Sequence, residues 1–242
     1  MSGTVAIREA TAAVWFDFGG VLSPPIPELF AAYERKTGIT PGQLQTAMAE
    51  VAAESGLPPL ATIELAHASE AEWGRALGQA LGRAAPAVDL SVCDLERFGV
   101  RWFEDIEVNA GMVELLIEVR DRGHKVGILT NNVVEWETIW RRIVDLDDVI
   151  DAIVDSCKVG VRKPDPEIFK IAAIRLKTPA DHNVLIDDVP ENCAAARASG
   201  WSAINFRNNS QTADALRKLL DGWEKAASGG ARRMKEMARH AH

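Results

Sequence analysis

The chain has 242 residues, of which 47% are hydrophobic and 26% charged, and this composition is ordinary for a soluble globular protein. Its length can hold one core domain plus a smaller insertion. The formal net charge of −8 argues against a nucleic-acid-binding surface. No run approaches the ~20 apolar residues that a membrane helix needs, and no secretory signal is evident, so we expect a cytoplasmic protein without a membrane partner. The cysteines are too far apart for a disulfide framework or a metal knuckle: Cys93, Cys157 and Cys193.

The first structured stretch is an apolar run that ends in an acid. Residues 12–23 read AAVWFDFGGVLS, which predicts a buried parallel strand ending at Asp17. Gly19 and Gly20 follow, and they allow the backbone to turn away sharply. Because open α/β sheets bind ligands at the carboxyl ends of their strands, Asp17 is a candidate nucleophile or metal ligand. The alternative is that Asp17 only caps the next turn.

Residues 24–107 have a helical pattern. The prolines between Ser23 and Pro27 stop the strand, and this loop is either a hinge or pocket wall or a rigid connector. Apolar residues then recur at helix spacing without strand-like alternation, and we expect the last helix at residues 94–103. If this insertion lies over a binding site, it holds several polar and aromatic candidates for substrate contacts: Tyr33, Glu64, His67, Trp73 and Trp102.

After Asn109, apolar runs of strand length alternate with amphipathic helices. This alternation predicts a parallel sheet with right-handed crossovers, so the fold class is α/β. Trp136 and Trp140 are four residues apart, which indicates either a packed helix face or a contact in a homodimer. The further strands are expected at residues 125–130, 152–154, 184–186 and 203–206.

The C-terminal part of the chain is expected to be a helix followed by a tail. Residues 212–223 have the pattern of an amphipathic helix. Ser228, Gly229 and Gly230 are expected to break it. Residues 226–242 are basic and poor in large apolar side chains, so we expect a mobile tail.

Two more of the predicted strands end in polar residues. Thr130, with Asn131 after it, ends one run, and Asp187 and Asp188 end another, with Lys163 between them in the stretch GVRKPDPEIF. Each has an ordinary interpretation by itself, because a lysine is usually at the surface and an acid often caps the next helix. Together with Asp17, and in this order, they indicate one site at one sheet edge.

Two neighbours of these residues have open roles. Asn192 either braces the acidic loop of Asp187 and Asp188 or simply lies in the first turn of the next helix. Arg162 is interpreted as a solvated neighbour of Lys163.

These motifs resemble those of the haloacid dehalogenase superfamily, in which an Asp strand end, a Ser or Thr strand end, a Lys and an acidic strand end follow in this order. The resemblance covers residues 12–207. It implies a Rossmann-like parallel sheet with strand order 5-4-1-2-3 and a small helical cap inserted after strand one. It divides the chain into an α/β core of residues 1–23 and 108–225, a cap of residues 24–107 and the tail.

The resemblance also implies a chemistry. Asp17 would attack phosphorus and form an aspartyl phosphate. Mg²⁺ would be shared by Asp17, Asp187, Asp188 and the carbonyl oxygen of Gly19, since it prefers oxygen ligands. The remaining positions would bind and neutralise the phosphoryl group: Thr130, Asn131 and Lys163. The expected protein is therefore a Mg²⁺-dependent phosphatase for a small phosphorylated metabolite, with a sugar phosphate favoured.

One position departs from the family pattern. Phosphatases of this superfamily usually carry a second Asp two residues after the nucleophile, where this chain has Gly19. Loss of a general acid–base typically costs ~10²–10⁴ in rate. The substrate then has a good leaving group, or another group supplies the proton, or the protein is mainly a binding module or pseudoenzyme. A metal-independent 2-haloacid dehalogenase is a further alternative, although the pair Asp187 and Asp188 would repel a haloacid carboxylate.

Overall fold

A computed structural model describes residues 11–53 and 55–240. Its centre is a five-stranded parallel sheet with the order β3-β2-β1-β4-β5. This confirms the expected order 5-4-1-2-3, which is the same order counted from the other edge. The strands are β1 (Ala13–Phe16), β2 (Lys125–Thr130), β3 (Ala152–Asp155), β4 (Asn183–Asp187) and β5 (Ser202–Asn205).

Both faces of the sheet are buried. Successive side chains of each strand point to opposite faces, so each strand contributes to both apolar clusters. Val14 and Phe16 of β1 pack into one apolar cluster, and Ala13 and Trp15 pack into the other. A strand that is covered on both sides reads as a continuous apolar run, which explains why the sequence around Asp17 shows no alternation.

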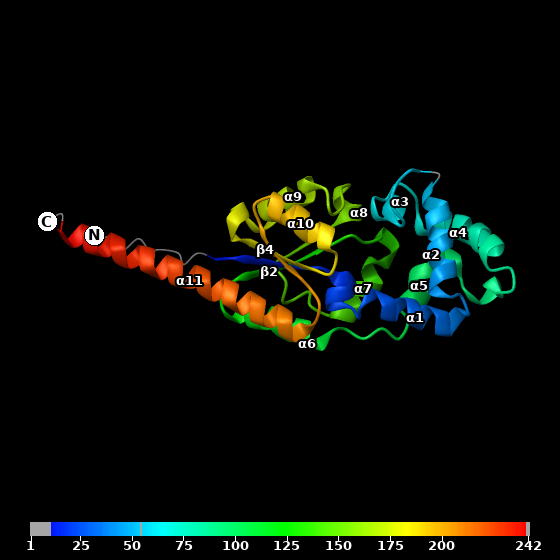
Figure 1. Ribbon diagram of the computed structural model, residues 1–242, viewed down its shortest axis with the longest axis horizontal. Helices are drawn as coiled ribbons and strands as arrows, with labels where there is room; N and C mark the ends of the chain where they lie inside the picture. Colours follow the sequence, from blue (N-terminus) through cyan, green and yellow to red (C-terminus); the bar gives the residue numbers. More distant parts are fainter. Residues whose placement is uncertain (1–10, 54, 241–242) are drawn as a thin grey trace.

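Helices form the two outer layers (Figure 1). On one face lie α6 (Ala110–Asp121) and α11 (Asn209–His240), and the other face carries α9 (Pro166–Leu176) and α10 (Pro190–Ala198). The shorter helices α7 (Glu137–Val144) and α8 (Ser156–Val159) follow β2 and β3. None of the helices in the described ranges is long and apolar enough to cross a membrane.

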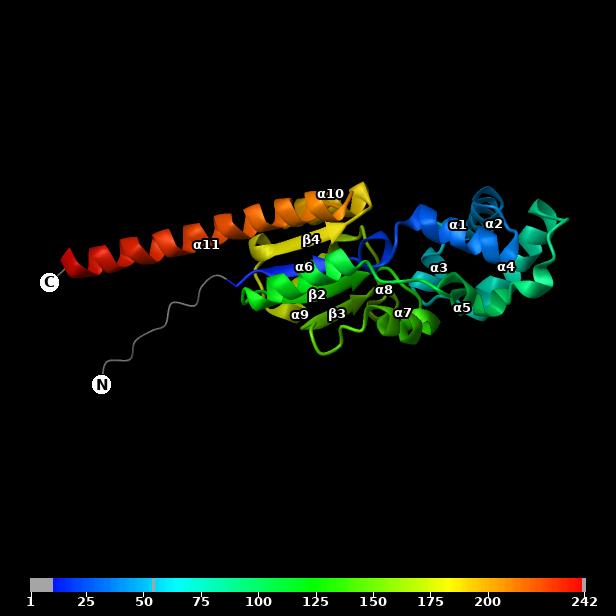
Figure 2. The ribbon, with the colours of Figure 1, turned by 90° about the horizontal axis from the view of Figure 1, so that it is seen from below.

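Helix α11 is longer than the sequence predicts. It continues through residues 228–230 to His240, so the predicted break is wrong. Glycine weakens a helix by only about 1 kcal/mol and, unlike proline, keeps the backbone N–H that the helix needs. The C-terminal part of α11 extends beyond the sheet (Figure 2). Mobility of residues 226–242 stays a prediction, and residues 1–10 and 241–242 lie outside the described part.

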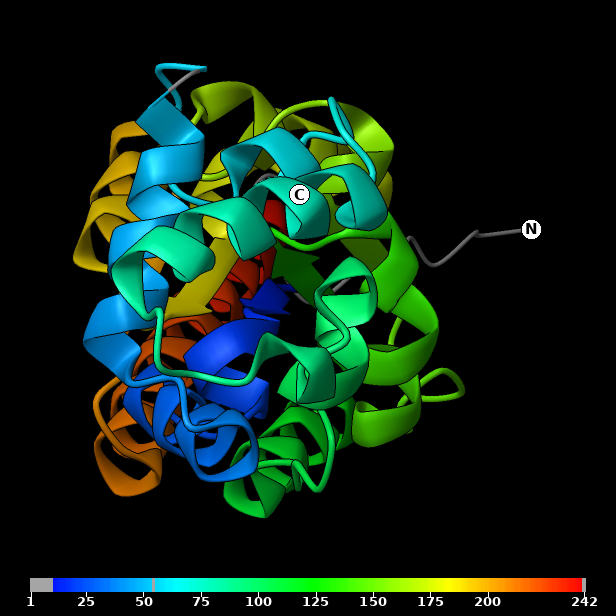
Figure 3. The same ribbon diagram turned by 90° about the vertical axis from the view of Figure 1, so that its right-hand side faces the viewer.

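Within residues 26–102, every regular element of the described residues is helical, and this stretch is called the helical segment below. The segment lies over the carboxyl end of the sheet (Figure 3). The helix expected at residues 94–103 is shorter and is preceded by a single 3-10 turn at Leu95–Arg97. The α-helices are α1 (Ile26–Thr37), α2 (Pro41–Ala53), α3 (Ala61–Glu64), α4 (Glu70–Ala84) and α5 (Phe98–Trp102).

Aromatic rings form the core of this helical segment. The ring of Phe98 lies 4.8 Å from that of Tyr33, 5.3 Å from that of Trp73 and 5.4 Å from that of Trp102, measured between centroids. Such pairs contribute about 0.5–1.5 kcal/mol each beyond the burial of their surface. Tyr33 and Trp73, two candidate substrate contacts, are therefore buried packing residues.

A buried carboxylate ties the helical segment to the α/β core. Glu70 Oε1 accepts hydrogen bonds from the backbone N–H of Gly99 and from Nε1 of Trp136, both at 2.6 Å. Gly99 belongs to α5, whereas Trp136 follows β2 in the core. The side chain of Trp136 also fills the space where a Cβ of Gly99 would lie, so the two parts fit closely there.

Two glycines of α4 provide a test of packing in the helical segment. A Cβ at Gly74 would overlap the carbonyl oxygen of Leu95, whereas a Cβ at Gly82 has no atom within 4 Å. We expect Gly74→Ala to lower the free energy of unfolding by about 1–3 kcal/mol. Gly82→Ala is expected to raise it by up to about 1 kcal/mol through helix propensity. Urea unfolding followed by circular dichroism measures both, and equal effects would contradict the close α4–Leu95 contact.

Candidate active site

The register of the sheet brings three of the predicted residues to one edge. Phe16 of β1 lies opposite Ile128 of β2 and Ile186 of β4. Asp17, Thr130 and Asp187 therefore follow at nearly the same level along their strands. Because the strands are parallel, these side chains gather at the carboxyl edge, beneath the helical segment.

Lys163 lies at the centre of this group. It precedes α9 and is only 1% exposed, which excludes the alternative of a surface lysine. Its Nζ lies 3.0 Å from Asp17 Oδ1 and 2.6 Å from Asp187 Oδ2, and it donates to the carbonyl oxygen of Leu129 at 2.8 Å. Burial by itself lowers the pKa of Lys163, but the two carboxylates outweigh burial and hold that pKa above its ordinary value.

The acidic side chains outnumber the lysine. One carboxylate oxygen each from Asp17, Asp187 and Asp188 lies within 4.8 Å of the other two. Burial raises the pKa of Asp17 to about 8 against the opposing effect of Lys163, and the neighbouring acids add to the rise. Burial, followed by the charge of Asp187, raises the pKa of Asp188 to about 6. Three converging carboxylates with one buried cation suit a hard divalent cation such as Mg²⁺.

Asp187 is held on both of its oxygens. Oδ2 pairs with Lys163, and Oδ1 accepts from the backbone N–H of Val189 at 2.9 Å and from Nδ2 of Asn192 at 3.0 Å. Asn192 thus braces the acidic loop, which is one of the two alternatives predicted for this residue. A fully buried carboxylate needs such partners, because an unpaired buried charge is very costly.

Asn131 holds the backbone of Lys163. Its Nδ2 donates to the Lys163 carbonyl oxygen at 2.9 Å, and its Oδ1 accepts from the Lys163 N–H at 2.8 Å. Both ends of the side-chain amide are therefore engaged, and a contact between this side chain and a substrate stays a prediction. Thr130 lies at the end of β2 and is 1% exposed. A ligand can therefore contact Thr130 only through an atom that reaches the sheet edge.

The two glycines after Asp17 differ in what they require. Gly20 has φ +73°, and a Cβ there would overlap the carboxylate of Asp188, so only glycine fits. Gly19 has φ −64° and ψ 123°, which any residue can adopt. A Cβ at Gly19 would meet only Cδ1 of Ile26, at 3.6 Å. The backbone conformation at position 19 therefore does not require glycine.

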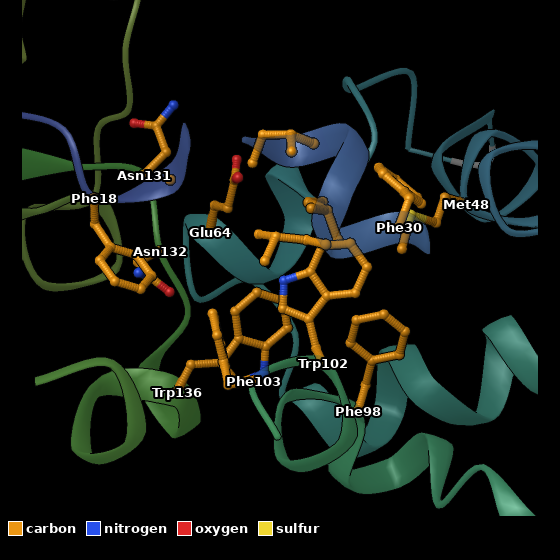
Figure 4. Close-up of a pocket in the computed structure, with 14 residues that line it drawn as sticks. Phe18, Phe30, Met48, Glu64, Phe98, Trp102, Phe103, Asn131, Asn132 and Trp136 are labelled. Carbon is orange, nitrogen blue, oxygen red and sulfur yellow. The ribbon is translucent and has the colours of Figure 1, made fainter. Parts of the chain in front are cut away.

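Two adjoining cavities meet at this edge. The outer cavity, of about 410 Å³, is lined by Asp17, Lys163 and Asp188. The inner cavity, of about 160 Å³, extends into the helical segment and is called the aromatic cavity below (Figure 4). Their linings share four residues: Gly19, Ile26, Glu64 and Asn131.

The structure separates the remaining candidates of the helical segment. Glu64 and Trp102 line the aromatic cavity, whereas His67 is exposed and lines neither cavity. Arg162 was interpreted as a solvated side chain, and this is wrong, because it is 22% exposed and its Nε lies 2.8 Å from Glu64 Oε2. The sequence carries no signal for this pair, which joins residues 98 positions apart.

Comparison with known proteins agrees with this geometry. The family model of haloacid dehalogenase-like hydrolases matches residues 11–200. The chain belongs to this family. The expected membership is thereby confirmed, and the protein is a hydrolase of the haloacid dehalogenase-like type.

Two relatives and one solved structure show how far the similarity reaches. Bifunctional epoxide hydrolase 2 of Sus scrofa is 27% identical over 221 residues, which is 87% of this chain but 38% of that protein. A phosphatase of Mycobacterium tuberculosis (strain CDC 1551 / Oshkosh) is 32% identical over 116 residues, 44% of this chain and 53% of the relative. A HAD family enzyme of Bacteroides thetaiotaomicron, solved in complex with magnesium and inorganic phosphate, has a TM-score of 0.59 and 17% identity over 81% of this chain and 94% of its own.

These numbers set the reach of each comparison. The chain spans less than two thirds of the length of either curated relative. The similarity to the solved enzyme supports the fold, because its sequence identity is low.

The charge balance of the site predicts a pH-dependent effect of Lys163→Met in the presence of a chelator. In this hydrolase the change leaves Asp17 and Asp187 without a cation, and removing one partner of a buried pair costs about 3–5 kcal/mol. The folded pKa of Asp17, already raised from the ordinary 3.8 to about 8, then rises further. The folded state holds protons that the unfolded state releases, so the stability of the variant falls as the pH rises.

Because the pKa of Asp17 is already about 8 in the native protein, a further rise acts above pH 8, and we expect the loss caused by Lys163→Met to be larger at pH 9.5 than at pH 7 in urea unfolding. Lys158→Met is the control, because Lys158 forms a half-exposed pair with Glu137, and such pairs contribute about 0–1 kcal/mol. A loss that is the same at both pH values would contradict the charge balance described here.

Proposed function

We propose that this hydrolase is a Mg²⁺-dependent phosphatase that acts on a small phosphorylated metabolite through an aspartyl-phosphate intermediate. The observation that carries the proposal is the convergence of three carboxylates and one buried lysine at the carboxyl end of the sheet. This arrangement has an excess of negative charge that a divalent cation balances, and the balanced site then accepts a phosphate. The Mycobacterium tuberculosis relative, described as a phosphatase, supports the same reaction class.

Asp17 is the proposed nucleophile. Its Oδ1 lies 3.0 Å from Nζ of Lys163 and accepts the N–H of Phe18 at 2.7 Å, which fixes the carboxylate and leaves Oδ2 for the attack. In the first step the bond from Oδ2 to phosphorus forms, the ester P–O bond breaks, and the leaving alkoxide takes a proton from solvent water, because position 19 offers no acid. In the second step water hydrolyses the aspartyl phosphate and releases inorganic phosphate.

The residues present fit the metal that this reaction needs. Asp17, Asp187 and Asp188 would hold Mg²⁺ together with the carbonyl oxygen of Gly19. The ion would supply the positive charge that offsets repulsion between a carboxylate and a phosphate dianion. Asp188 approaches Gly20 so closely that a Cβ at position 20 would overlap its carboxylate.

Lys163 adds positive charge, and Thr130 and Asn131 are the proposed contacts of the transferred phosphoryl group. Lys163 is held on both sides, by the carboxylates at its Nζ and by Asn131 at its backbone. Such fixed charges stabilise a transition state more effectively than mobile ones, because they need no reorganisation during the reaction.

The glycine at position 19 favours one competing function. Without a nearby general acid, the protein could bind a phosphorylated ligand and turn it over very slowly, as a binding module does. The 2-haloacid dehalogenase alternative is tested in the same experiment by chloride release from 2-chloropropionate without metal.

The nucleophile is tested by phosphate release from a panel of sugar, acyl, alkyl and nucleotide phosphates, with Mg²⁺ or with a chelator. We expect turnover that needs Mg²⁺ and falls by at least ~10⁴-fold in Asp17→Asn, since losing a nucleophile has effects of this size. Asp165→Asn is the matched control, because Asp165 caps α9 and Asn caps a helix equally well. Unchanged turnover in Asp17→Asn would rule out the assignment, and tight binding without turnover would favour the binding module.

The missing acid is tested by Gly19→Asp. The backbone angles and the free space around position 19 accommodate the side chain. We expect kcat to rise by ~10²-fold or more for ethyl phosphate, whose alcohol needs a proton to leave. The increase is expected to be small for p-nitrophenyl phosphate, whose leaving group needs none. Gly19→Asn, equal in size but unable to transfer a proton, is the control, and an equal gain in both variants would contradict a general-acid effect.

A further inference from the structure

We propose that the alcohol part of the substrate is apolar, and that the substrate is a phosphate monoester of an alcohol carrying a ring or branched group of about six carbons. The group occupies the aromatic cavity while the phosphate lies at Asp17. This inference rests on the proposed phosphatase function and names its substrate class.

The aromatic cavity leads directly away from the catalytic edge. Gly19, Ile26, Glu64 and Asn131 line both this cavity and the outer cavity that contains Asp17 and Lys163. A substrate whose phosphate lies at the sheet edge therefore points its alcohol part either to solvent or into the aromatic cavity. Figure 4 shows Glu64 between Asn131 and Phe18 on the core side and the rings of the helical segment.

The wall of the aromatic cavity is mainly apolar. Helix α1 contributes Ile26, Leu29 and Phe30, which are spaced to share one face. Aromatic rings continue the wall beside Phe30, with Trp102 5.1 Å from Phe30 in an edge-on contact. Further apolar lining comes from Met48, Leu60, Phe98 and Phe103.

Three polar side chains of the wall are engaged within the protein. Glu64 pairs with Arg162, the amide of Asn131 is bonded to the backbone of Lys163, and Nε1 of Trp136 donates to Glu70. A sugar needs partners for several hydroxyl groups, and a buried hydroxyl without a partner weakens binding by about fivefold or more. The wall therefore suits a hydrocarbon better than the sugar phosphate expected from the resemblance.

The size of the aromatic cavity sets the size of the group. Its volume is about 160 Å³, and an apolar cavity of ~150 Å³ in another protein binds benzene. A six-membered ring or a branched chain of similar volume fills it, whereas a long straight chain does not fit.

Gly19 connects this cavity with the missing acid. It lines both cavities, and a Cβ there would meet only the side chain of Ile26. A carboxylate at position 19 would place a charge at the mouth of an apolar space. Removing that charge from water is unfavourable. Glycine instead adds neither bulk nor charge to the passage between the phosphate site and the aromatic cavity.

The test compares three phosphate esters of primary alcohols, so that the leaving groups are similar: cyclohexylmethyl phosphate, ethyl phosphate and glucose 6-phosphate. Each buried methylene is worth about fourfold in binding. We expect kcat/KM for cyclohexylmethyl phosphate to exceed the values for the other two by at least about 30-fold. Turnover of all three esters without this preference would overturn the substrate class and leave the phosphatase function intact.

Two variants locate the preference in the aromatic cavity. Phe30→Ala removes part of the wall, and Met48→Gln, which is nearly equal in size, introduces an amide. Each is expected to reduce the ratio of kcat/KM between cyclohexylmethyl phosphate and ethyl phosphate by about tenfold. Val100→Ala is the control, because Val100 is exposed on α5. A ratio that stays unchanged in both cavity variants would overturn the inference.

A binding measurement separates failure of the substrate class from failure of the phosphatase function. If no ester is hydrolysed, the neutral alcohol cyclohexylmethanol is titrated into the native protein in a calorimeter. Saturable binding that weakens in Phe30→Ala would support the apolar ligand although the phosphatase proposal had failed. Absence of saturable binding would overturn the apolar site as well.

Discussion

The site depends on one electrostatic constraint, the burial of Lys163 among more negative charges than it can balance. Its ammonium group lies between Asp17 and Asp187, and Asp188 adds a third carboxylate. A buried charge is tolerated only with close partners. The protein therefore needs these side chains in one place, and the remaining negative charge is what the proposed cation would balance.

Much of the surrounding structure keeps these charges in position. The parallel strands deliver Asp17 and Asp187 to the same level of the sheet, Asn131 fixes the backbone of Lys163, and Asn192 fixes the carboxylate of Asp187. Asn192 contacts the charged group itself, whereas Asn131 holds the backbone that carries the charged side chain. Both amides replace water that would bind the same atoms at a surface, and they do so without adding charge.

The helical segment gives the charged edge a second, chemically opposite neighbour. The proposed phosphate site and the aromatic cavity share a wall at Gly19 and Ile26. The hydrogen bonds from Gly99 and Trp136 to Glu70 join the segment to the core. Under the proposed function, the two halves of one ester would be bound by different forces, charge for the phosphate and burial of apolar surface for the alcohol.

The sequence by itself determined the α/β class, and its resemblance to the family supplied the strand order and the candidate acids, because apolar runs that end in Asp17, Thr130 and Asp187 are local patterns. Only the tertiary structure decided which partner each side chain has. The pair of Glu64 and Arg162 and the double contact of Asn131 join residues far apart in the chain, and no local periodicity encodes such contacts. The aromatic cavity is likewise a property of packing, since the same aromatic residues in a sequence can fill a core or line a hollow.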